Sequence, residues 1–287
     1  MLDIKIYDSQ DEVSWCPGCG NHSILPALKQ TLAELELKPH QVVIVSGIGQ
    51  AAKTPHYINA NGFNGLHGRA VPPAQGIKIA NKDLKVIIHS GDGDTYGEGG
   101  NHLIHGVRRN VDITHVVHLN QIYGLTKGQA SPTTAKGQKT SMQFDGNKME
   151  PLQTLLLAIA AGCGFVARSF SGDKEHLVNI LKEAINYKGY ALIDVLQPCV
   201  VFNHINNFRW YKDRVYRLDT SDYDPTNKIE AMKKAMEWGD HGIPIGVLYR
   251  EEKDTFMDKI SYLKEGDALV DRKWEPKEAE KYMEDFR

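Results

Sequence analysis

Short apolar runs alternate along this chain with longer stretches in which apolar and polar residues recur at helical spacing. The runs have strand length and β-branched composition, and they lie at Val42–Ser46, Val86–Ser90, Ile113–Leu119, Cys163–Ala167, Ala191–Leu196 and Ile245–Tyr249. The helix-like stretches that flank and separate them are His22–Leu35, Pro72–Ala80, Gly99–Arg109, Pro151–Ala161, Lys174–Asn186 and Lys228–Trp238. Because strands and helices of these lengths alternate as in βαβ units, the sequence predicts an α/β fold whose mostly parallel sheet carries helices on both faces.

One domain accounts for most of the chain. Its 287 residues, 41% of them hydrophobic, are enough to bury one large core, and no internal repeat, low-complexity tract or long linker indicates a second domain. After Tyr249 the sequence becomes rich in Lys, Glu and Asp, with few apolar residues. We therefore predict an α/β domain over residues 1–250 and a C-terminal tail over residues 251–287 that wraps the surface and offers a contact for a partner.

The charge balance gives no general attraction to nucleic acid or to an anionic membrane, because the formal net charge is only -2. The chain has no run of 18 apolar residues, and its first residues contain no apolar signal segment. These features predict a cytoplasmic protein without a nucleic-acid or membrane partner. Four cysteines are too few for a disulfide scaffold at this length, which suggests a metal or redox role for some of them.

Two predicted strands are each followed by polar residues suited to a divalent cation. Val86–Ser90 leads into Gly91-Asp92-Gly93-Asp94, and the next strand along the chain leads into Asn120. Open α/β sheets bind ligands at the carboxyl ends of their strands. Since Mg²⁺ takes oxygen ligands and shares them with phosphates and water, we expect Asp92, Asn120 and the carbonyl of Ile122 to hold a Mg²⁺–diphosphate group.

Glycines 91 and 93 let the backbone approach phosphate oxygens, to which the following amides can donate hydrogen bonds. An isolated Gly-Asp-Gly is more often only a tight turn. Asn120 at the end of a second strand favours the diphosphate site. Neither of the usual nucleotide fingerprints, G-x-x-x-x-G-K-[ST] or G-x-G-x-x-G, follows a strand here.

The segment GDGD, followed by HLNQIYGLTKGQASPTT at residues 118–134, resembles the thiamine-diphosphate motif in the β subunits of 2-oxoacid:ferredoxin oxidoreductases. WCPGCGNHSIL, SGIG, LHGRA, LIDVLQPC and MEWGD resemble the same subunits in the same order, so the resemblance covers most of the chain. It implies a thiamine-diphosphate-binding fold and a CoA-dependent oxidative decarboxylation of a 2-oxoacid, or the reverse carboxylation. Electrons would pass through a [4Fe–4S] cluster to ferredoxin.

The same resemblance assigns roles to individual residues. It makes Asp92, Asn120 and the Ile122 carbonyl the Mg²⁺ ligands. The cofactor-binding residues that it implies are Gly47, Ile48, Gly49, His67, Gly91, Asp92, Gly93, Asp94, Asn120, Ile122, Tyr123, Gly124, Leu125 and Thr126.

Three residues would act near the reacting carbon. Lys53 would recognise the distal end of the 2-oxoacid, which favours 2-oxoglutarate over pyruvate, although it could also be a solvated surface lysine. His67 would lie near the diphosphate and the reaction centre, although a lone histidine is usually structural. Leu125 would shape the substrate pocket.

The CPGC motif at residues 16–19 forms a turn that presents two thiolates to one ion, which fits zinc, an iron–sulfur cluster or a redox dithiol. The resemblance makes Cys16, Cys19 and Cys199 ligands of the cluster, but Gln50 stands where many relatives have the fourth cysteine. Three outcomes stay open: a non-cysteine fourth ligand, completion by Cys163, or a weak or absent cluster. We expect three cysteines with one unusual ligand, and Cys163 as a small core residue.

The glutamate that activates the aminopyrimidine of thiamine diphosphate cannot be assigned in this chain. The resemblance places it in a partner, an α or fused α/γ subunit with the pyrimidine-binding domain, so the chain would be active only in a heterodimer. One alternative is a component of a non-redox thiamine decarboxylase or synthase, which has no need for the three cysteines. Another is a zinc-stabilised assembly protein that uses the cysteines with His22 or His67, but this leaves the GDGD motif without a purpose.

Overall fold

The computed structural model describes residues 2–220, 222–273 and 275–286. Positions 1 and 221 of the predicted domain and positions 274 and 287 of the predicted tail lie outside these ranges. The strands are β1 Val42–Ser46, β2 Asn61–Asn64, β3 Lys85–Gly91, β4 Ile113–Leu119, β5 Ile122–Tyr123, β6 Gln129–Ala130, β7 Phe165–Phe170, β8 Tyr190–Leu196, β9 Val215–Arg217 and β10 Ile243–Arg250. The α-helices are α1 Asn21–Glu34, α2 Val71–Ala80, α3 Gly100–Arg109, α4 Thr154–Ala160, α5 Lys174–Asn186, α6 Phe208–Lys212, α7 Lys228–Met236, α8 Ser261–Lys264 and α9 Lys277–Met283. Shorter 3-10 turns include η1 Ile4–Tyr7, η2 Pro39–Gln41, η3 Ala51–His56, η5 Gly239–His241, η6 Leu269–Asp271 and η7 Glu284–Phe286, and η4 Gly93–Glu98 is a π-helical turn.

A single eight-stranded sheet forms the centre of the molecule, in the order β2-β1-β3-β4-β8-β7-β10-β9. The neighbours from β2 to β7 pair in parallel, and β10 runs antiparallel to β7. Every residue of β1, β4 and β8 is buried, as expected for parallel strands covered on both faces. The predicted mostly parallel α/β fold is confirmed.

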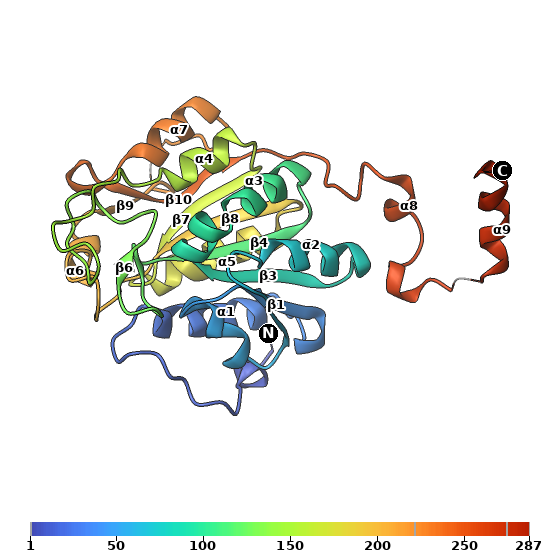
Figure 1. Ribbon diagram of the computed structural model, residues 1–287, viewed down its shortest axis with the longest axis horizontal. Helices are drawn as coiled ribbons and strands as arrows, with labels where there is room; N and C mark the ends of the chain where they lie inside the picture. The colour runs from blue at the N-terminus through green and yellow to red at the C-terminus, as the bar shows by residue number, and fades with distance from the viewer. Residues whose placement is uncertain (1, 221, 274, 287) are drawn as a thin grey trace.

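Helices cover both faces of this sheet, and each face has its own apolar core. Residues of α1 and α5 pack with one set of strand side chains, which includes Ile44, Ile87 and Val116. Residues of α2, α3, α4 and α7 pack with the alternate set, which includes Val45 and Val117. Figure 1 shows α1 on one side of the sheet and α4 and α7 on the other. The alternation follows from the two-residue period of a strand.

The predicted elements around Cys163 end at different residues from those expected. The strand predicted at Cys163–Ala167 runs instead over Phe165–Phe170, and the helix predicted at Pro151–Ala161 is shorter, over Thr154–Ala160. Gly162 has φ of +91°, a conformation that ends the helix and favours glycine. The strand therefore starts only after this turn.

Some short elements were missed because they have no apolar pattern of their own. All four residues of β2 are exposed, yet they pair in parallel with β1 at the edge of the sheet. The pair β5 and β6 has only two residues in each strand. Tertiary contacts, rather than local sequence, fix such elements.

Within the described residues, the C-terminal tail contacts the body in its first part, as far as η6 at Leu269–Asp271. The backbone N–H of Phe256 donates to the carbonyl of Asn110, and the ammonium of Lys82 donates to the carbonyls of Lys264 and Gly266. Figure 1 shows α9 standing away from the sheet and its helices. No helix within the described ranges combines the length and apolar character of a membrane span.

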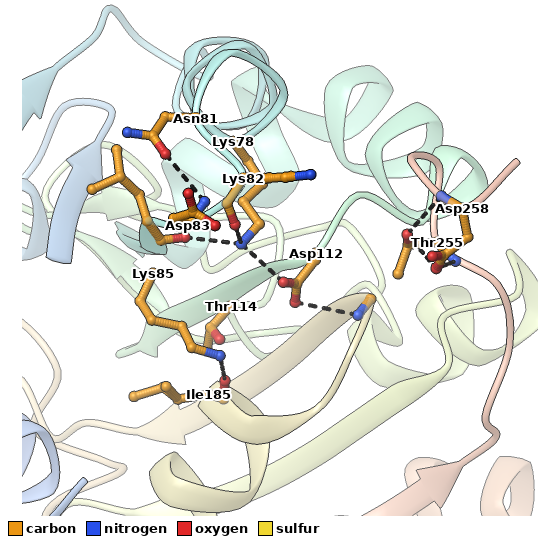
Figure 2. A network of polar contacts seen from close by, with 12 residues as sticks. Lys78, Asn81, Lys82, Asp83, Lys85, Asp112, Thr114, Ile185, Thr255 and Asp258 are labelled. Atoms are coloured by element: carbon orange, nitrogen blue, oxygen red, sulfur yellow. Dashed lines mark hydrogen bonds and ion pairs between the residues drawn. The ribbon is translucent and has the colours of Figure 1, made fainter. Parts of the chain in front are cut away.

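A polar network ties helices to the amino edge of the sheet, away from the carboxyl ends that face ligands (Figure 2). The ammonium of Lys78, on α2, is buried and donates to the carbonyls of Lys82 and Leu84 at 2.8 and 2.9 Å. It also forms a 3.0 Å ion pair with Asp112, the residue before Ile113 of β4. Lys85, the first residue of β3, donates to the carbonyl of Ile185 on α5. This edge is thus fixed by bonds between distant elements.

Candidate active site at the carboxyl edge of the sheet

A cavity of about 460 Å³ lies at the carboxyl edge of the strands, beside the ends of β1, β3 and β4. Its wall contains most of the residues that the sequence assigns to cofactor binding, together with several that it does not. The lining residues are Ile48, Gly49, Gln50, Ala51, His67, Gly91, Asp92, Gly93, Asp94, Glu98, Asn120, Ile122, Tyr123, Gly124, Leu125, Thr126, Gln129 and Ala130.

Asp94 joins the loops that follow β1 and β2. Its Oδ1 accepts hydrogen bonds from the backbone N–H of Ile48 at 3.0 Å and of Gly68 at 2.8 Å. Its Oδ2 is buried and has no partner in the described part of the chain. A Cβ at Gly47 would lie 2.0 Å from Asp94 Oδ2, so only glycine fits there. Asp94 lines the cavity, whereas Gly47 does not and instead gives the Asp94 carboxylate the space that it occupies.

Asp92 follows β3 and is 1% exposed. Its Oδ2 accepts hydrogen bonds from the hydroxyl of Ser131, at 2.6 Å, and from that of Thr133. Burial raises the pKa of the Asp92 carboxyl to about 6, even though these hydrogen bonds lower it. A buried carboxylate of this kind is stabilised by a cation.

Asn120 directly follows β4, and both polar atoms of its side chain are hydrogen-bonded. Its Oδ1 accepts from the backbone N–H of Ile122 at 3.0 Å, and its Nδ2 donates to Oε1 of Gln197 at 3.1 Å. Gln121, between the two, has φ of +61°, and this left-handed residue turns the chain from β4 into β5. Asp92, Asn120 and Ile122 therefore meet at one cavity, and their oxygens are of the kind that Mg²⁺ prefers.

Tyr123 also lines the cavity and packs against Gly93, the residue after Asp92. Its hydroxyl donates to the carbonyl of Gly93 at 3.3 Å, and a Cβ at Gly93 would lie 2.2 Å from its ring. Burial first, and then the carboxylate of Glu98, raises the pKa of the Tyr123 hydroxyl. The GDGD segment is thus more than a tight turn, because Gly93 begins the π-helical turn η4, a form that is common at functional sites.

The residues expected near the reacting carbon lie at different places. His67, Leu125 and Thr126 line the cavity and are exposed to it or to solvent, Leu125 at 39%. Lys53 does not line the cavity. Lys53 stands two residues after Ala51, which does line the cavity. The ammonium of Lys53 donates to the hydroxyl of Ser14 at 3.1 Å.

Sequence reasoning missed Ser131, Thr133, Glu98 and Gln197. Ser131 and Thr133 lie inside the segment whose resemblance was noted, but hydroxyl residues in a loop carry no sign of a distant carboxylate partner. Gln197 directly follows β8 and precedes Pro198 and Cys199. This position at the carboxyl end of a strand was the sequence feature that could have indicated a place in the site.

Cys16, Cys19 and Cys199 line a second, smaller cavity of about 30 Å³, which also touches Gln50 and Asn120. The backbone N–H of Gly20 donates to the carbonyl of Pro198 at 3.2 Å and so brings the CPGC turn next to Cys199. Burial raises the pKa of the Cys19 thiol to about 11, and the nearby thiols of Cys199 and Cys16 contribute in the same direction.

The thiol donor set fits an iron–sulfur cluster in its chemistry, since cysteine sulfur is the usual ligand of such clusters. Oε1 of Gln50 is buried, has no hydrogen-bond partner in the described residues, and belongs to a side chain that lines both cavities. Across residues 2–220, 222–273 and 275–286, no three His, Cys, Asp or Glu side chains are grouped closely enough to hold a metal ion. This finding includes the three cysteine thiols, so their assignment to one cluster rests on the cavity that they share and on the chemistry of sulfur. The proposed Mg²⁺ ligands include only one carboxylate and therefore form no group of this type.

Cys163 lies elsewhere. It is 0% exposed, packs in the core on the α2, α3, α4 and α7 face, and donates to the carbonyls of Phe165 and Tyr190, both at 3.3 Å. Burial raises the pKa of its thiol to about 12. It lines neither cavity, as expected for a small core residue.

Comparison with known proteins points to one family. Residues 40–195 match the C-terminal TPP-binding domain of thiamine pyrophosphate enzymes, and residues 199–265 match the C-terminal part of the pyruvate ferredoxin oxidoreductase beta subunit. The chain is 49% identical over 269 residues to the beta subunit of 2-oxoacid:ferredoxin oxidoreductase 1 of Aeropyrum pernix, covering 90% of this chain and 84% of the relative. It is 36% identical over 260 residues to the 2-oxoglutarate synthase subunit KorB of Methanocaldococcus jannaschii, covering 90% and 95%.

A solved structure has the same fold. It is the 2-oxoglutarate:ferredoxin oxidoreductase from Magnetococcus marinus with 2-oxoglutarate, coenzyme A and succinyl-CoA bound. The two chains superpose with a TM-score of 0.91 at 31% identity, over 98% of this chain and 96% of the other.

Proposed function

Because this chain belongs to the β subunits of 2-oxoacid:ferredoxin oxidoreductases, we propose that it binds thiamine diphosphate through Mg²⁺ and oxidises a 2-oxoacid together with a partner subunit. In the proposed reaction, a 2-oxoacid anion, coenzyme A and two oxidised ferredoxins give acyl-CoA, CO₂, two reduced ferredoxins and one proton. The bound thiamine diphosphate would supply the carbon nucleophile and the electron sink for this chemistry.

The observation that carries the proposal is the meeting of Asp92, Asn120 and Ile122 at one cavity. The Asp92 carboxylate and the Asn120 amide oxygen would bind Mg²⁺, with the Ile122 carbonyl as a third ligand from the chain. Asp94 would hold the loops at Ile48 and Gly68 around the cofactor, since its carboxylate already joins their amides. Preorganised contacts of this kind fix a cofactor without further ordering of the protein.

We propose 2-oxoglutarate as the preferred substrate over pyruvate. Lys53 supports this, because it lies on η3, which begins at a residue of the cavity wall, and among the described residues its ammonium donates to the neutral hydroxyl of Ser14 rather than to a carboxylate. Rotation of its long side chain would bring the charge towards the distal carboxylate of a dicarboxylate substrate. The relatives named for 2-oxoglutarate agree with this assignment.

Cys16, Cys19 and Cys199 would hold a [4Fe–4S] cluster that receives the electrons, with Gln50 facing the fourth iron. The support is the cavity that they share with Gln50, and the unpaired oxygen that Gln50 presents there. Asn120 lines both cavities, so a cofactor in one would lie close to a cluster in the other. A short distance of this kind would favour electron transfer from the thiamine diphosphate to the cluster.

The partner would cover the mouth of the larger cavity and supply the activating glutamate. Leu125 lines the cavity and Leu66 precedes His67 of its wall, with 39% and 72% of their surface exposed. Met142 and Phe144, 62% and 74% exposed, flank Gln143, whose Oε1 accepts from the backbone N–H of Ala130 in the cavity wall. Exposed apolar side chains of this number around one site are typical of protein interfaces. The tail over residues 251–287 would extend the contact beyond the α/β domain of residues 1–250.

The test is anaerobic purification of the chain with its co-expressed partner, followed by iron, sulfide and thiamine assays on one sample. We expect thiamine diphosphate and about four irons per heterodimer if the partner brings no cluster of its own. Asp92→Asn should lose thiamine diphosphate but retain iron, because the amide keeps an oxygen but removes the negative charge that a carboxylate brings to Mg²⁺. Asp240→Asn, an exposed aspartate on η5, is the matched control. Equal thiamine content in the two variants would contradict the proposed cation site.

Substrate preference is tested by 2-oxoacid- and CoA-dependent reduction of ferredoxin. Lys53→Ala should raise the KM for 2-oxoglutarate by about tenfold or more, because it removes a charged hydrogen bond. The KM for pyruvate, which has no distal carboxylate, should change little. An equal effect on both substrates would remove Lys53 from substrate recognition.

A further inference from the structure

Gln197 lies between the two cavities and is 1% exposed. It directly follows β8, and its backbone N–H donates to the carbonyl of Leu119 at 2.9 Å, which continues the pairing of β8 with β4. A Cβ at Gly20 would lie 2.9 Å from Cγ of Gln197, so glycine there lets the start of α1 close on this side chain. The carboxamide is therefore held by the rigid end of the sheet.

The hydrogen bonds of Gln197 determine which way its amide faces. Nε2 donates to the carbonyl of Pro198 at 2.8 Å and to Sγ of Cys19 at 3.3 Å. Since a carbonyl oxygen can only accept, Nε2 must stand on this side, and Oε1 must face Asn120. Oε1 there accepts from Nδ2 of Asn120, at 3.1 Å.

The same reasoning fixes Asn120. Its Nδ2 is committed to Gln197, so its Oδ1 faces the amide of Ile122 and not the cysteines. The neighbouring Asn203 supports this arrangement, because its Nδ2 donates to the backbone carbonyl of Asn120 at 3.0 Å. The orientation of an oxygen assigned to Mg²⁺ thus depends on a residue that touches a cysteine.

We propose that Gln197 is a positioning residue that couples the two halves of the site: it orients Asn120 towards the cation and donates an N–H···S hydrogen bond to the cluster ligand Cys19. This inference rests on the proposed function. A hydrogen bond to a ligand sulfur stabilises the reduced, more negative cluster more than the oxidised one, and so raises its reduction potential. A buried glutamine with a merely structural role would leave the potential unchanged.

The experiment is a redox titration of the purified complex, in which the electron paramagnetic resonance signal of the reduced cluster is followed. Gln197→Met keeps the length of the side chain but removes both amide interactions. The equilibrium constant for reduction of its cluster should fall about tenfold, because a hydrogen bond to a charged group is lost. Gln75→Met is the control, since Gln75 is also buried but lies on α2, where its Nε2 donates to the carbonyl of Val71.

A second variant separates the two arms of the inference. Gln197→Glu keeps an oxygen that can accept from Asn120 but has no N–H for Cys19. It should show the shifted potential and nearly normal Mg²⁺-dependent binding of thiamine diphosphate, whereas Gln197→Met should weaken that binding severalfold. If Gln197→Met does not fold, Gln197→Glu still tests the N–H donor: the loss of the donor and the added negative charge both lower the potential, so an unchanged potential would overturn the inference.

Normal cluster content with an unchanged potential in both variants would overturn the inference and leave the proposed function intact. A wild-type complex that contains thiamine diphosphate but no iron would show that Cys19 is not a cluster ligand. It would then overturn both this inference and the proposed electron route. That failure is visible in the wild type before any variant is measured, so the two results are distinguishable.

Discussion

At the scale of single residues, several buried histidines lie within the strands of the sheet and are hydrogen-bonded there. His115 bonds to the hydroxyl of Ser90 through Nε2 and to that of Tyr190 through Nδ1, both at 2.7 Å. His89 and His118 bond to each other at 2.9 Å between ring nitrogens. Burial lowers the pKa of His89 and of His115 to about 3, so both are uncharged in the folded chain.

These pKa values predict a loss of stability in mild acid. The unfolded chain takes up protons on His89 and His115 below about pH 6.5, and the folded chain does not, so the free energy of unfolding falls as the pH is lowered from there towards 3. The slope should approach about 1.4 kcal/mol per pH unit for each histidine. Urea unfolding between pH 7.5 and 5 measures it, and His89→Asn should reduce it while the exposed His204→Asn should not. Asp92 acts in the opposite sense below about pH 6, because its raised pKa makes the folded chain bind a proton first, so the comparison of variants is decisive. Equal slopes in the wild type and His89→Asn would contradict the assignment of a neutral His89.

At the scale of elements, the two edges of the sheet have different roles. The carboxyl edge carries loops whose carboxylates and amides line a cavity. The amino edge carries the network of Lys78, Asp112 and Lys85, in which charged side chains bond to helix and loop carbonyls (Figure 2). Stability and ligand binding are therefore separable by mutation.

Lys78→Met tests this separation. The variant loses the ion pair with Asp112 and two buried bonds to carbonyls, and should lower the free energy of unfolding by about 2–3 kcal/mol. Binding of thiamine diphosphate should be unchanged at a temperature where the variant is folded. Lys188→Met, at an exposed lysine on the same edge, should change the stability by less than about 0.5 kcal/mol. Chemical unfolding compares the two, and equal effects would mean that the buried network adds little.

At the scale of the whole molecule, the chain has surfaces that suit a partner better than solvent. Tyr282, Met283 and Phe286 are 61%, 58% and 88% exposed at the end of the tail, and Figure 1 shows this end standing away from the body. Apolar side chains on a projecting segment gain stability when a second surface covers them.

Deletion of residues 275–287 should therefore weaken assembly with the partner. We expect the dissociation constant of the complex to rise by about tenfold or more, because burial of a few large apolar side chains is lost. Sedimentation of mixtures at decreasing concentration measures this, and the stability of the isolated chain should not change. The exposed Ile229→Ser on α7 is the control. An unchanged dissociation constant would show that the tail has another role.

The sequence by itself determined the fold class and the edge at which the site forms. Apolar runs of strand length at Val42–Ser46 and Ile113–Leu119 coincide with β1 and β4, because a fully buried parallel strand needs a continuous local pattern. Asp92 and Asn120 follow such strands, so topology alone brings them to the same edge.

Only the tertiary structure decided how those residues are held. Ser131 and Thr133 reach Asp92 across about forty positions of sequence, and Gln197 joins Asn120 to Cys19 across still longer separations. Such contacts leave no periodic signal, because each depends on the packing of elements that are distant in the chain. The position of α9, which stands away from the body in Figure 1, also left no signal in the sequence. The composition predicted a polar tail but not where that tail would lie.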